Sequence, residues 1–261
     1  MAFDLSNFVI DRIVRGVAQS QKDDSILFSI NQIQNASLNC ASESTDAVDA
    51  LGTPIATFYR AKSAEFSAEN ALFDMNLLAT QLGTTKKVAA SDSKITAPAM
   101  ESFTTSSTTY ALKHAPKVAP TELYALNGDS TFGVKYTKGT SATATTFAIS
   151  ETGTITLPTG IPSGTNMFIM YEYETENAIE VLNSATEYPV GCKFVMEVLG
   201  CDVCDQTNLV YAYLVFPNFK LSPDFDWSIA TDGAHPFSGK AQQDYCDPQK
   251  RLFYIIIPGE D

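Results

Sequence analysis

The residues whose types and spacing come closest to a chemical site are four cysteines in the last third of the chain. Cys201 and Cys204 are separated by two residues, with Cys192 before them and Cys246 after them. Two thiolates at this spacing can hold one face of a tetrahedral zinc ion, which Cys192 with Cys246 or His235 could complete. Zinc sites of this type usually contain a second closely spaced pair, and the remaining ligands here are dispersed. The pattern therefore favours buried or turn cysteines with neither a metal nor a thiol redox role.

The histidines and the acidic residues do not add a second candidate. His114 lies in a loop with Lys and Pro, and His235 lies in the turn at residues 231–236, so both are expected to be exposed. The sequence has no glycine-rich phosphate loop, no nucleophile elbow and no HExxH helix. Its acids are scattered, so nothing supplies a nucleophile, a base and an orienting group together. The sequence predicts no catalytic residue and no cofactor, which argues against an enzyme.

The charge balance restricts the partners of the chain. Its 261 residues include 30 acidic and 17 basic side chains, a formal net charge of −13. Such a chain repels phosphate, which argues against nucleic-acid binding by charge neutralisation. No stretch reaches the roughly eighteen apolar residues of a membrane span, and the N-terminus lacks the basic start and apolar run of a signal peptide. With five irregularly spaced cysteines, the chain is expected to be made and kept in a cytoplasm, away from membranes.

A mainly β fold must position these residues. Charged residues make up only 18% of the chain, whereas Thr and aromatic residues are frequent, a composition that favours strands. A phase slip at Ile33 indicates a bulge in the first strand, and the isoleucines at 255–257 are expected to be buried on both faces. The acidic, small residues 41–53 predict a loop. Strands are predicted at residues 25–37, 55–66, 194–199, 209–216, 225–230 and 252–257.

Two segments have helical spacing. Residues 8–17 carry apolar side chains at near-helical intervals, which predicts a short helix. Residues 68–82 predict a longer amphipathic helix, with Ser67 as its N-cap and Gly83 in the left-handed position after its end. An amphipathic helix among strands is expected to lie across a sheet face or at the edge of a sandwich.

The middle of the chain predicts a separate small domain. Between residues 121 and 173 the sequence alternates short strand-like segments with close turns, a pattern typical of a small antiparallel sandwich. We therefore predict one discontinuous core domain, residues 1–115 and 176–261, with a sandwich of residues 116–175 inserted into it. The strands of the sandwich are expected at residues 123–126, 132–136, 146–149, 154–157 and 167–173.

Several segments of the sequence resemble virion and tail proteins of phages that infect Gram-positive hosts. The family that these segments indicate is the tail tube proteins of tailed bacteriophages. The likeness extends over most of the chain without one diagnostic motif. The segments are residues 65–83 (EFSAENALFDMNLLATQLG), 171–182 (YEYETENAIEVL), 200–205 (GCDVCD), 215–219 (VFPNF) and 231–246 (TDGAHPFSGKAQQDYC).

The resemblance implies a β-sandwich or β-barrel core with one flanking α-helix, a small inserted immunoglobulin-like β-sandwich and no catalytic residue. It implies a homo-oligomer of rings, six subunits in each, stacked into a tube through which DNA passes without specific binding. Other virion tail proteins are the implied partners, and the virion tail, assembled in the host cytoplasm, is the implied location. Ring stacking can order residues 41–54 on the next ring, which makes Glu43, Asp46 and Asp49 candidate interface residues. An acidic lumen would keep DNA from adhering to the wall.

Two other classes of protein share this composition. A head decoration, neck or fibre-type virion protein would bind the capsid or a receptor through the inserted sandwich and would form trimers or remain monomeric. A carbohydrate- or host-binding module is suggested by Trp227, Tyr211 and Tyr213. Aromatic side chains on strands are more often part of a core, which favours the tube over this second alternative.

Overall fold

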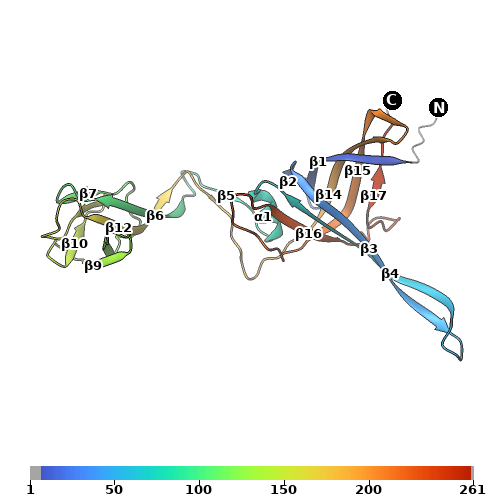
Figure 1. Ribbon diagram of the computed structural model, residues 1–261, viewed down its shortest axis with the longest axis horizontal. Coiled ribbons are helices and arrows are strands. Elements are labelled where there is room, and N and C mark those ends of the chain that lie inside the picture. Colours follow the sequence, from blue (N-terminus) through green and yellow to red (C-terminus); the bar gives the residue numbers. More distant parts are fainter. Residues whose placement is uncertain (1–6, 260–261) are drawn as a thin grey trace. The chain divides into compact units, whose positions relative to one another are not determined.

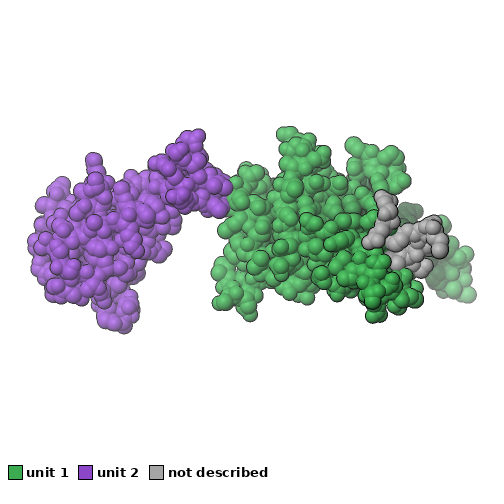
Figure 2. All heavy atoms as spheres, turned by 90° about the horizontal axis from the view of Figure 1, so that it is seen from above, with its two compact units in different colours: residues 1–86, 181–261 green, residues 87–180 purple. Residues whose placement is uncertain are grey.

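The computed structural model describes residues 7–259 and divides into two compact units, which Figure 2 colours separately. Unit 1 comprises residues 1–86 and 181–261, and unit 2 comprises residues 87–180. The described residues form seventeen strands and one α-helix, so the predicted mainly β fold with one flanking helix is confirmed. No helix among residues 7–259 is long and apolar enough to cross a membrane.

Unit 1 is built on one curled antiparallel sheet (Figure 1), whose strands follow the order β2-β1-β14-β15-β16-β4-β3, with β17 paired to β15. Strands from the two ends of the chain alternate in this sheet, because β1 pairs with β14 and β4 pairs with β16. The bounds are β1 Phe8–Ser20, β2 Ile26–Ile30, β3 Ile33–Val48, β4 Pro54–Asn70, β14 Gly191–Asp202, β15 Asp205–Leu221, β16 His235–Ala241 and β17 Tyr254–Ile256.

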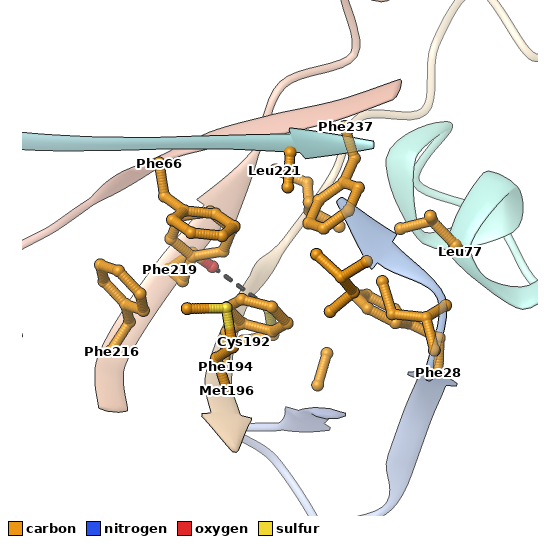
Figure 3. Packing of buried hydrophobic residues seen from close by; sticks show 14 of the residues in the cluster. Phe28, Phe66, Leu77, Cys192, Phe194, Met196, Phe216, Phe219, Leu221 and Phe237 are labelled. Carbon is orange, nitrogen blue, oxygen red and sulfur yellow. Dashed lines mark hydrogen bonds between the residues drawn. The ribbon is translucent and has the colours of Figure 1, made fainter. Parts of the chain in front are cut away.

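Phenylalanine rings fill the inside of this sheet (Figure 3). Phe66, Phe194 and Phe216 come from three different strands and are at most 2% exposed. The ring of Phe194 lies between 5.4 and 6.2 Å from five other phenylalanine rings. The helix α1 (Met75–Gln81) adds the buried Leu77 to the same cluster. Because each buried phenylalanine contributes about 1.5–3 kcal/mol, this cluster is the main source of stability in unit 1.

The N-terminal segment is a strand, and the predicted helix at residues 8–17 is wrong. These residues belong to β1, which pairs with β14 from Phe8 to Ser20. Its register shifts twice, between Ile10 and Arg12 and again between Ile13 and Arg15. Each irregularity moves the apolar positions out of simple alternation, and their spacing then imitates a helix. The phase slip predicted at Ile33 is the break between β2 and β3 rather than a bulge.

The helix is shorter than the sequence pattern predicted. It begins at Met75 rather than Ala68, because the carboxylate of Asp74 accepts hydrogen bonds from the backbone N–H groups of Asn76 and Leu77 at 2.9 and 2.7 Å. This is N-cap geometry, so Ser67 is not the cap. Residues 68–70 remain in β4, where they pair with β16. Gly83 has φ +73°, which confirms its predicted left-handed position after the helix.

The C-terminal strands differ from the prediction in three places. Residues 225–230 form no strand, and the ring of Trp227 instead stacks on Phe73 at 4.2 Å. The strand β16 was not predicted, because its Pro, Gly and Lys residues resemble a turn. The predicted burial of the isoleucines on both faces is wrong, since Ile255 and Ile256 are exposed on β17. This strand pairs only with β15, which leaves its outer edge free.

Unit 2 contains a seven-stranded sheet in the order β6-β12-β8-β9-β10-β11-β7. The five strands predicted in the middle of the chain are all present, although β9 and β10 run parallel and the sheet is therefore not wholly antiparallel. Leu123, Phe147 and Met167 are among the fully buried side chains of its core. The bounds are β6 Ile95–Thr104, β7 Thr109–Ala111, β8 Glu122–Leu126, β9 Phe132–Lys138, β10 Thr146–Ile149, β11 Thr154–Thr156 and β12 Asn166–Thr175.

Unit 2 begins well before residue 116, the start of the predicted insert. The strand β6 pairs with β12 over ten residues, and β7 pairs with β11, so both belong to unit 2. Pro98 lies within β6, which is acceptable because β6 is the edge strand of the sheet. At the two ends of unit 2, β5 (Lys87–Val88) pairs with β13 (Ile179–Glu180), so the chain enters and leaves the unit at adjacent positions.

Candidate assembly surfaces

Beyond the body of the unit 1 sheet, β3 and β4 continue as a two-stranded ribbon, which we call the arm (residues 41–63; Figure 1). Every residue of the arm is exposed. The ladder of pairs runs from Ala41 and Ser63 to Val48 and Pro54. The prediction of a loop at residues 41–53 is therefore wrong for most of this segment. A strand with no buried face has no apolar alternation, which is why its small and acidic residues resemble a loop.

The three predicted interface residues, Glu43, Asp46 and Asp49, all lie on the arm. Glu43 is paired in register with Arg60, and Asp46 accepts a hydrogen bond from the Thr57 hydroxyl at 2.7 Å. Asp49 holds the turn, since its Oδ1 accepts from the backbone N–H groups of Thr53 and Leu51 at 2.9 and 2.8 Å. These hydrogen bonds lower the pKa of Asp49. The acids therefore shape the ribbon itself, and their role in an interface remains a prediction.

The base of the arm contains a β-bulge. Ala41 pairs with Ser63 and Glu43 pairs with Arg60, so β4 has one more residue than β3 between these pairs. Ala61 takes up the extra length with φ +48°, in the left-handed region that alanine rarely adopts. A bulge bends a ribbon and increases its twist, so this one sets the direction in which the arm leaves the sheet.

The arm also exposes large apolar side chains. Leu51 at the turn is 92% exposed, and Ile55 and Tyr59 on β4 are each 70% exposed. Phe58 and Val48 are exposed as well. A two-stranded ribbon without a core is only marginally stable in water, and its two free edges can pair with other strands. Exposed apolar groups on such a ribbon indicate a surface that becomes covered in an assembly.

A second apolar surface lies where the arm strands leave the sheet. It is a groove of about 400 Å³, and none of its lining side chains is charged. Leu38 of β3 and Phe66 of β4 form one wall, and Ile10, Ile13 and Ile255 extend it toward solvent. The sequence did not single out this groove, because its residues come from six strands that are far apart in the chain. Its lining residues are Phe8, Ile10, Ile13, Ala36, Ser37, Leu38, Phe66, Met196, Val198, Ala212, Leu214 and Ile255.

The opposite face of the same sheet carries a polar cluster. Arg15 Nε donates to Glu197 Oε2 at 2.6 Å, and the Tyr213 hydroxyl donates to Glu197 Oε1 at 3.2 Å. The carboxylate of Glu197 raises the pKa of Arg15 through this hydrogen bond. Because side chains alternate between the faces of a strand, this cluster and the groove lie on opposite sides of β14 and β15.

Acidic charge is concentrated in unit 1. This unit contains 21 acidic and 11 basic residues, a net charge of −10, whereas unit 2 contains 9 and 6, a net charge of −3. Most of the charge imbalance of the chain therefore belongs to the unit that carries the arm and the groove.

The structure does not bring the four candidate metal-ligating cysteines together. Cys192 and Cys201 lie nine residues apart on the extended strand β14, which separates them by about 30 Å. Cys192 is buried, its thiol donates to the Phe219 carbonyl at 3.3 Å (Figure 3), and burial raises its pKa to about 12. Among residues 7–259, no three His, Cys, Asp or Glu side chains are grouped so as to hold a metal. The expectation of a metal-free protein remains a prediction.

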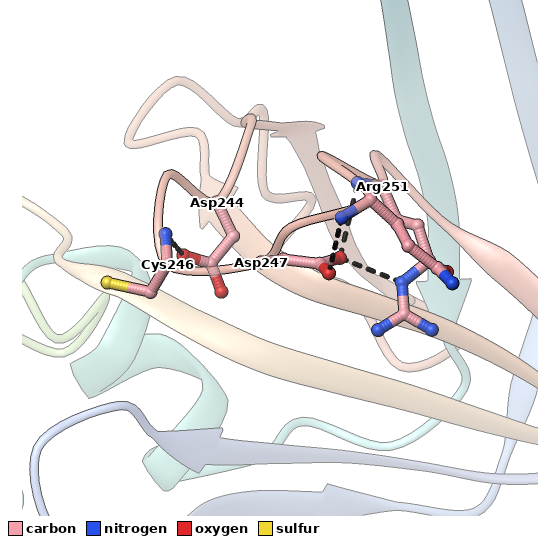
Figure 4. Close-up of polar contacts among 5 residues, drawn as sticks. Asp244, Cys246, Asp247 and Arg251 are labelled. Atoms are coloured by element: carbon pink, nitrogen blue, oxygen red, sulfur yellow. Dashed lines mark hydrogen bonds and ion pairs between the residues drawn. The ribbon is translucent and has the colours of Figure 1, made fainter.

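The other cysteines occupy turns. Cys204 is exposed in the turn between β14 and β15, and Cys246 is exposed in the loop after β16. The backbone N–H of Cys246 donates to Asp244, and Arg251 Nε donates to Asp247 at 2.7 Å (Figure 4). The Cys246 sulfur points away from both carboxylates (Figure 4). These acids therefore organise the loop and do not form a ligand set with the cysteine.

One histidine prediction is wrong. His235 is fully buried, because it begins β16 rather than lying in an open turn. Its Nε2 is 2.8 Å from Gln81 Oε1, and its Nδ1 accepts from the backbone N–H of Asp74 at 3.4 Å, which joins the helix to the sheet. Burial lowers the pKa of His235. His114 is exposed as predicted and stacks on Tyr173 at 3.9 Å.

The sequence model of the YomU/Tube protein family matches residues 8–253, which is nearly the whole chain. The chain belongs to the YomU/Tube protein family. Among curated proteins, none matches.

Membership of the YomU/Tube family makes the chain a phage tail tube structural protein, located in the virion tail and assembling with other virion proteins. Proteins of this kind are typically not enzymes. The matched region spans both units. Of the three aromatic residues that suggested a host-binding module, Trp227 stacks on Phe73 in a loop, whereas Tyr211 and Tyr213 lie on β15.

Proposed function

We propose that copies of this chain assemble into rings of six subunits, that the rings stack into the tail tube, and that the arm of each copy docks in the apolar groove of a neighbour. The observation that carries this proposal is the complete exposure of residues 41–63, together with the apolar side chains of the ribbon. A ribbon of this kind needs a partner to become ordered and to remove its apolar surface from water.

The arm cannot reach the groove of its own chain. Leu38 and Phe66 line the groove at the base of the same strands that form the arm. From Leu38 to Val48 the ribbon is extended over ten residue steps, about 33 Å at roughly 3.3 Å per residue, and the tip would have to fold back along itself. Contact between an arm and a groove must therefore join two copies.

The geometry of the contact between arm and groove is also compatible with rings and stacks. The arm and the groove are different surfaces of one chain, so their contact is heterologous. Heterologous contacts continue from copy to copy, and they close into rings or extend as filaments. The free edges of β3, β4 and β17 supply backbone groups for strand pairing between the same neighbours.

We further propose that the tube is a conduit for DNA and that unit 1 lines it. The net charge of −10 on unit 1 supports this role, because an acidic wall repels phosphate and lets DNA pass without specific binding. Glu43, Asp46 and Asp49 would lie at the contact between copies. In a structure of the assembled tube, a neutral or basic lumen would contradict the conduit proposal.

Unit 2 is proposed to be an immunoglobulin-like domain that is dispensable for assembly. The pairing of β5 with β13 supports this, because the two ends of the unit are held side by side by the pairs Val88–Ile179 and Lys87–Glu180. Residues 88–179 can therefore be replaced by a short Gly/Ser linker without stretching unit 1. Loss of assembly in that variant would mean that unit 2 is part of the tube wall.

The test is electron microscopy of the purified protein at high concentration. Long tubes of stacked rings support the proposal, whereas isolated trimers or monomers favour a decoration, neck or fibre protein. An armless variant, with residues 42–62 replaced by an Asn-Gly turn, should remain folded and form no tubes. Tubes formed by this variant would refute the role of the arm.

The groove is tested by one substitution and a matched control. Ile10 is 62% exposed and lines the groove, whereas Ile26 is 66% exposed and lies outside it on β2. Ile10→Glu should abolish tubes while the melting temperature of the monomer stays within a few degrees. Ile26→Glu should form tubes as the wild type does. Equal effects of the two substitutions would remove the groove from the proposal.

A further inference from the structure

Unit 2 has a groove that takes no part in the surfaces described above. It is an open hollow of about 440 Å³. Its lining residues come from the neighbouring strands β6, β12, β8 and β9 and from the turn between β8 and β9. This volume is within the range of roughly 300–1,000 Å³ that is usual for small-ligand sites. None of its eight lining residues is charged. We call it the unit 2 groove.

Four of the eight lining residues of the unit 2 groove are apolar (Phe103, Leu126, Phe132 and Phe168), and two of them are aromatic rings in contact. Phe132 on β9 is 59% exposed, and its ring lies 5.1 Å from that of Phe168 on β12. The ring of Tyr124 on β8 lies 5.0 Å from that of Phe132. An exposed phenylalanine held by two aromatic neighbours offers a fixed apolar surface, and such surfaces on soluble proteins commonly bind something.

The other four lining residues carry hydroxyl or amide groups. The Thr104 hydroxyl donates to Asn166 Oδ1 at 2.8 Å, which fixes the amide and leaves its nitrogen available as a donor. Ser102 is paired in register with Phe168, beside the aromatic rings. A few neutral polar groups that converge beside an apolar surface are typical of a small-ligand site.

Ser130 completes the lining from an unusual backbone position. It ends the turn between β8 and β9 with φ +65°, in the left-handed region that glycine normally occupies in hairpins of this length. A serine here bears a steric cost that glycine would avoid, and its side chain lines the unit 2 groove. The turn thus keeps a hydroxyl at the edge of the groove where no side chain is needed for folding.

We propose that the unit 2 groove binds a neutral saccharide. The C–H face of a sugar ring packs on Phe132 and Phe168, and its hydroxyls exchange hydrogen bonds with Asn166 and the serine and threonine hydroxyls. The absence of charged groups from the lining argues for a neutral ligand. A protein partner is the weaker fit, because the centre of a protein interface is mainly apolar, whereas half of the lining residues here are polar. The inference concerns unit 2 alone and does not depend on tube assembly.

The experiment is saturation-transfer NMR on the full-length protein, with maltose, cellobiose and N,N′-diacetylchitobiose as neutral probes and sialyllactose as an anionic probe. At least one neutral disaccharide should receive saturation at its ring protons with millimolar affinity. Phe132→Ala and Asn166→Ala should each weaken that binding at least tenfold, without a change in melting temperature, because both side chains are exposed. Trp227→Ala, which changes a partly exposed aromatic residue of unit 1, should leave binding unchanged.

Four outcomes would overturn the proposal. These are no transfer to any neutral probe at 20 mM, stronger transfer to sialyllactose than to the neutral probes, unchanged binding in Phe132→Ala, and loss of binding in Trp227→Ala. Binding of another tail protein that Phe132→Ala abolishes, without saccharide binding, would identify the unit 2 groove as a protein-docking site instead. Failure of tube assembly in the wild type leaves each of these readouts intact.

Discussion

Unit 1 contains two long hairpins of similar backbone geometry and opposite surroundings. In the β14–β15 hairpin, Phe194, Met196 and Phe216 are buried against the rest of the sheet. In the arm, the equivalent ladder of β3 and β4 is exposed along residues 41–63. The comparison shows that backbone pairing alone does not indicate where stability comes from. The first hairpin is stabilised by packing within its own chain, whereas the arm has no such packing along residues 41–63.

The largest expected difference between the hairpins is in the opening of their hydrogen bonds. Amide hydrogen exchange of the monomer should show the arm opening at a cost near zero, whereas the central β14–β15 amides should open only with global unfolding, at about 5 kcal/mol or more. In assembled tubes the arm amides should become protected. Protected arm amides in the monomer would mean that the arm already has a partner within its own chain.

Truncation of one phenylalanine in each hairpin gives the next largest contrast. Phe216→Ala should destabilise unit 1 by about 3–5 kcal/mol, because it leaves a cavity among the rings of Phe66, Phe194 and Phe219. Phe58→Ala on the arm should change the stability of the monomer by about 0.5 kcal/mol or less and should impair tube formation. Urea unfolding and electron microscopy measure the two effects. Equal destabilisation by both substitutions would end the distinction between the hairpins.

A smaller effect is expected from pH at the point where β4 ends. His235 pairs in register with Asn70, the last residue of β4, and its buried ring has a lowered pKa in the folded state. A histidine with a lowered folded pKa is neutral when folded, so its stability contribution is full above about pH 6.5, the unfolded value, and falls as the pH decreases toward the folded value.

Unit 1 should therefore lose stability as the pH falls below about 6.5, and His235→Phe should remove this dependence while lowering stability at pH 7. Thermal melting at a series of pH values measures both effects. An unchanged slope in the variant would show that another group is responsible.

The smallest effect is expected at the tip of the β14–β15 hairpin. Cys204→Ser should change stability by less than about 0.5 kcal/mol, because the side chain is exposed in a turn. Elemental analysis of the wild type should find well under one zinc per chain. Stoichiometric zinc, with unfolding on chelation, would contradict the metal-free prediction.

The sequence predicted best where strands have one buried face. Five of the seven strands in the unit 2 sheet were located to within two residues, since Leu123, Phe147 and Met167 alternate with less buried neighbours, whereas β6 and β7 were missed. It failed where that alternation is absent: in β1, whose register shifts imitate a helix, and in the arm, which has no buried face. The sequence did single out the acidic residues of the arm, but the exposed apolar side chains of Ile55 and Tyr59 on the same ribbon were assigned to an ordinary strand. The apolar groove of unit 1 could not be predicted from the sequence, because its lining residues are far apart in the chain and only the fold brings them together.

If the arm of one copy docks in the groove of the next, as we propose, a stack of copies has two unlike ends. One end presents unused arms, and the other presents unfilled grooves. Growth is then directional, since a copy can join only in one orientation at each end. A protein that starts the tube needs to imitate only one of these surfaces, and a protein that stops it needs to cover the other. The 23 residues of the arm, 41 to 63, would thus determine the polarity of the whole tail tube.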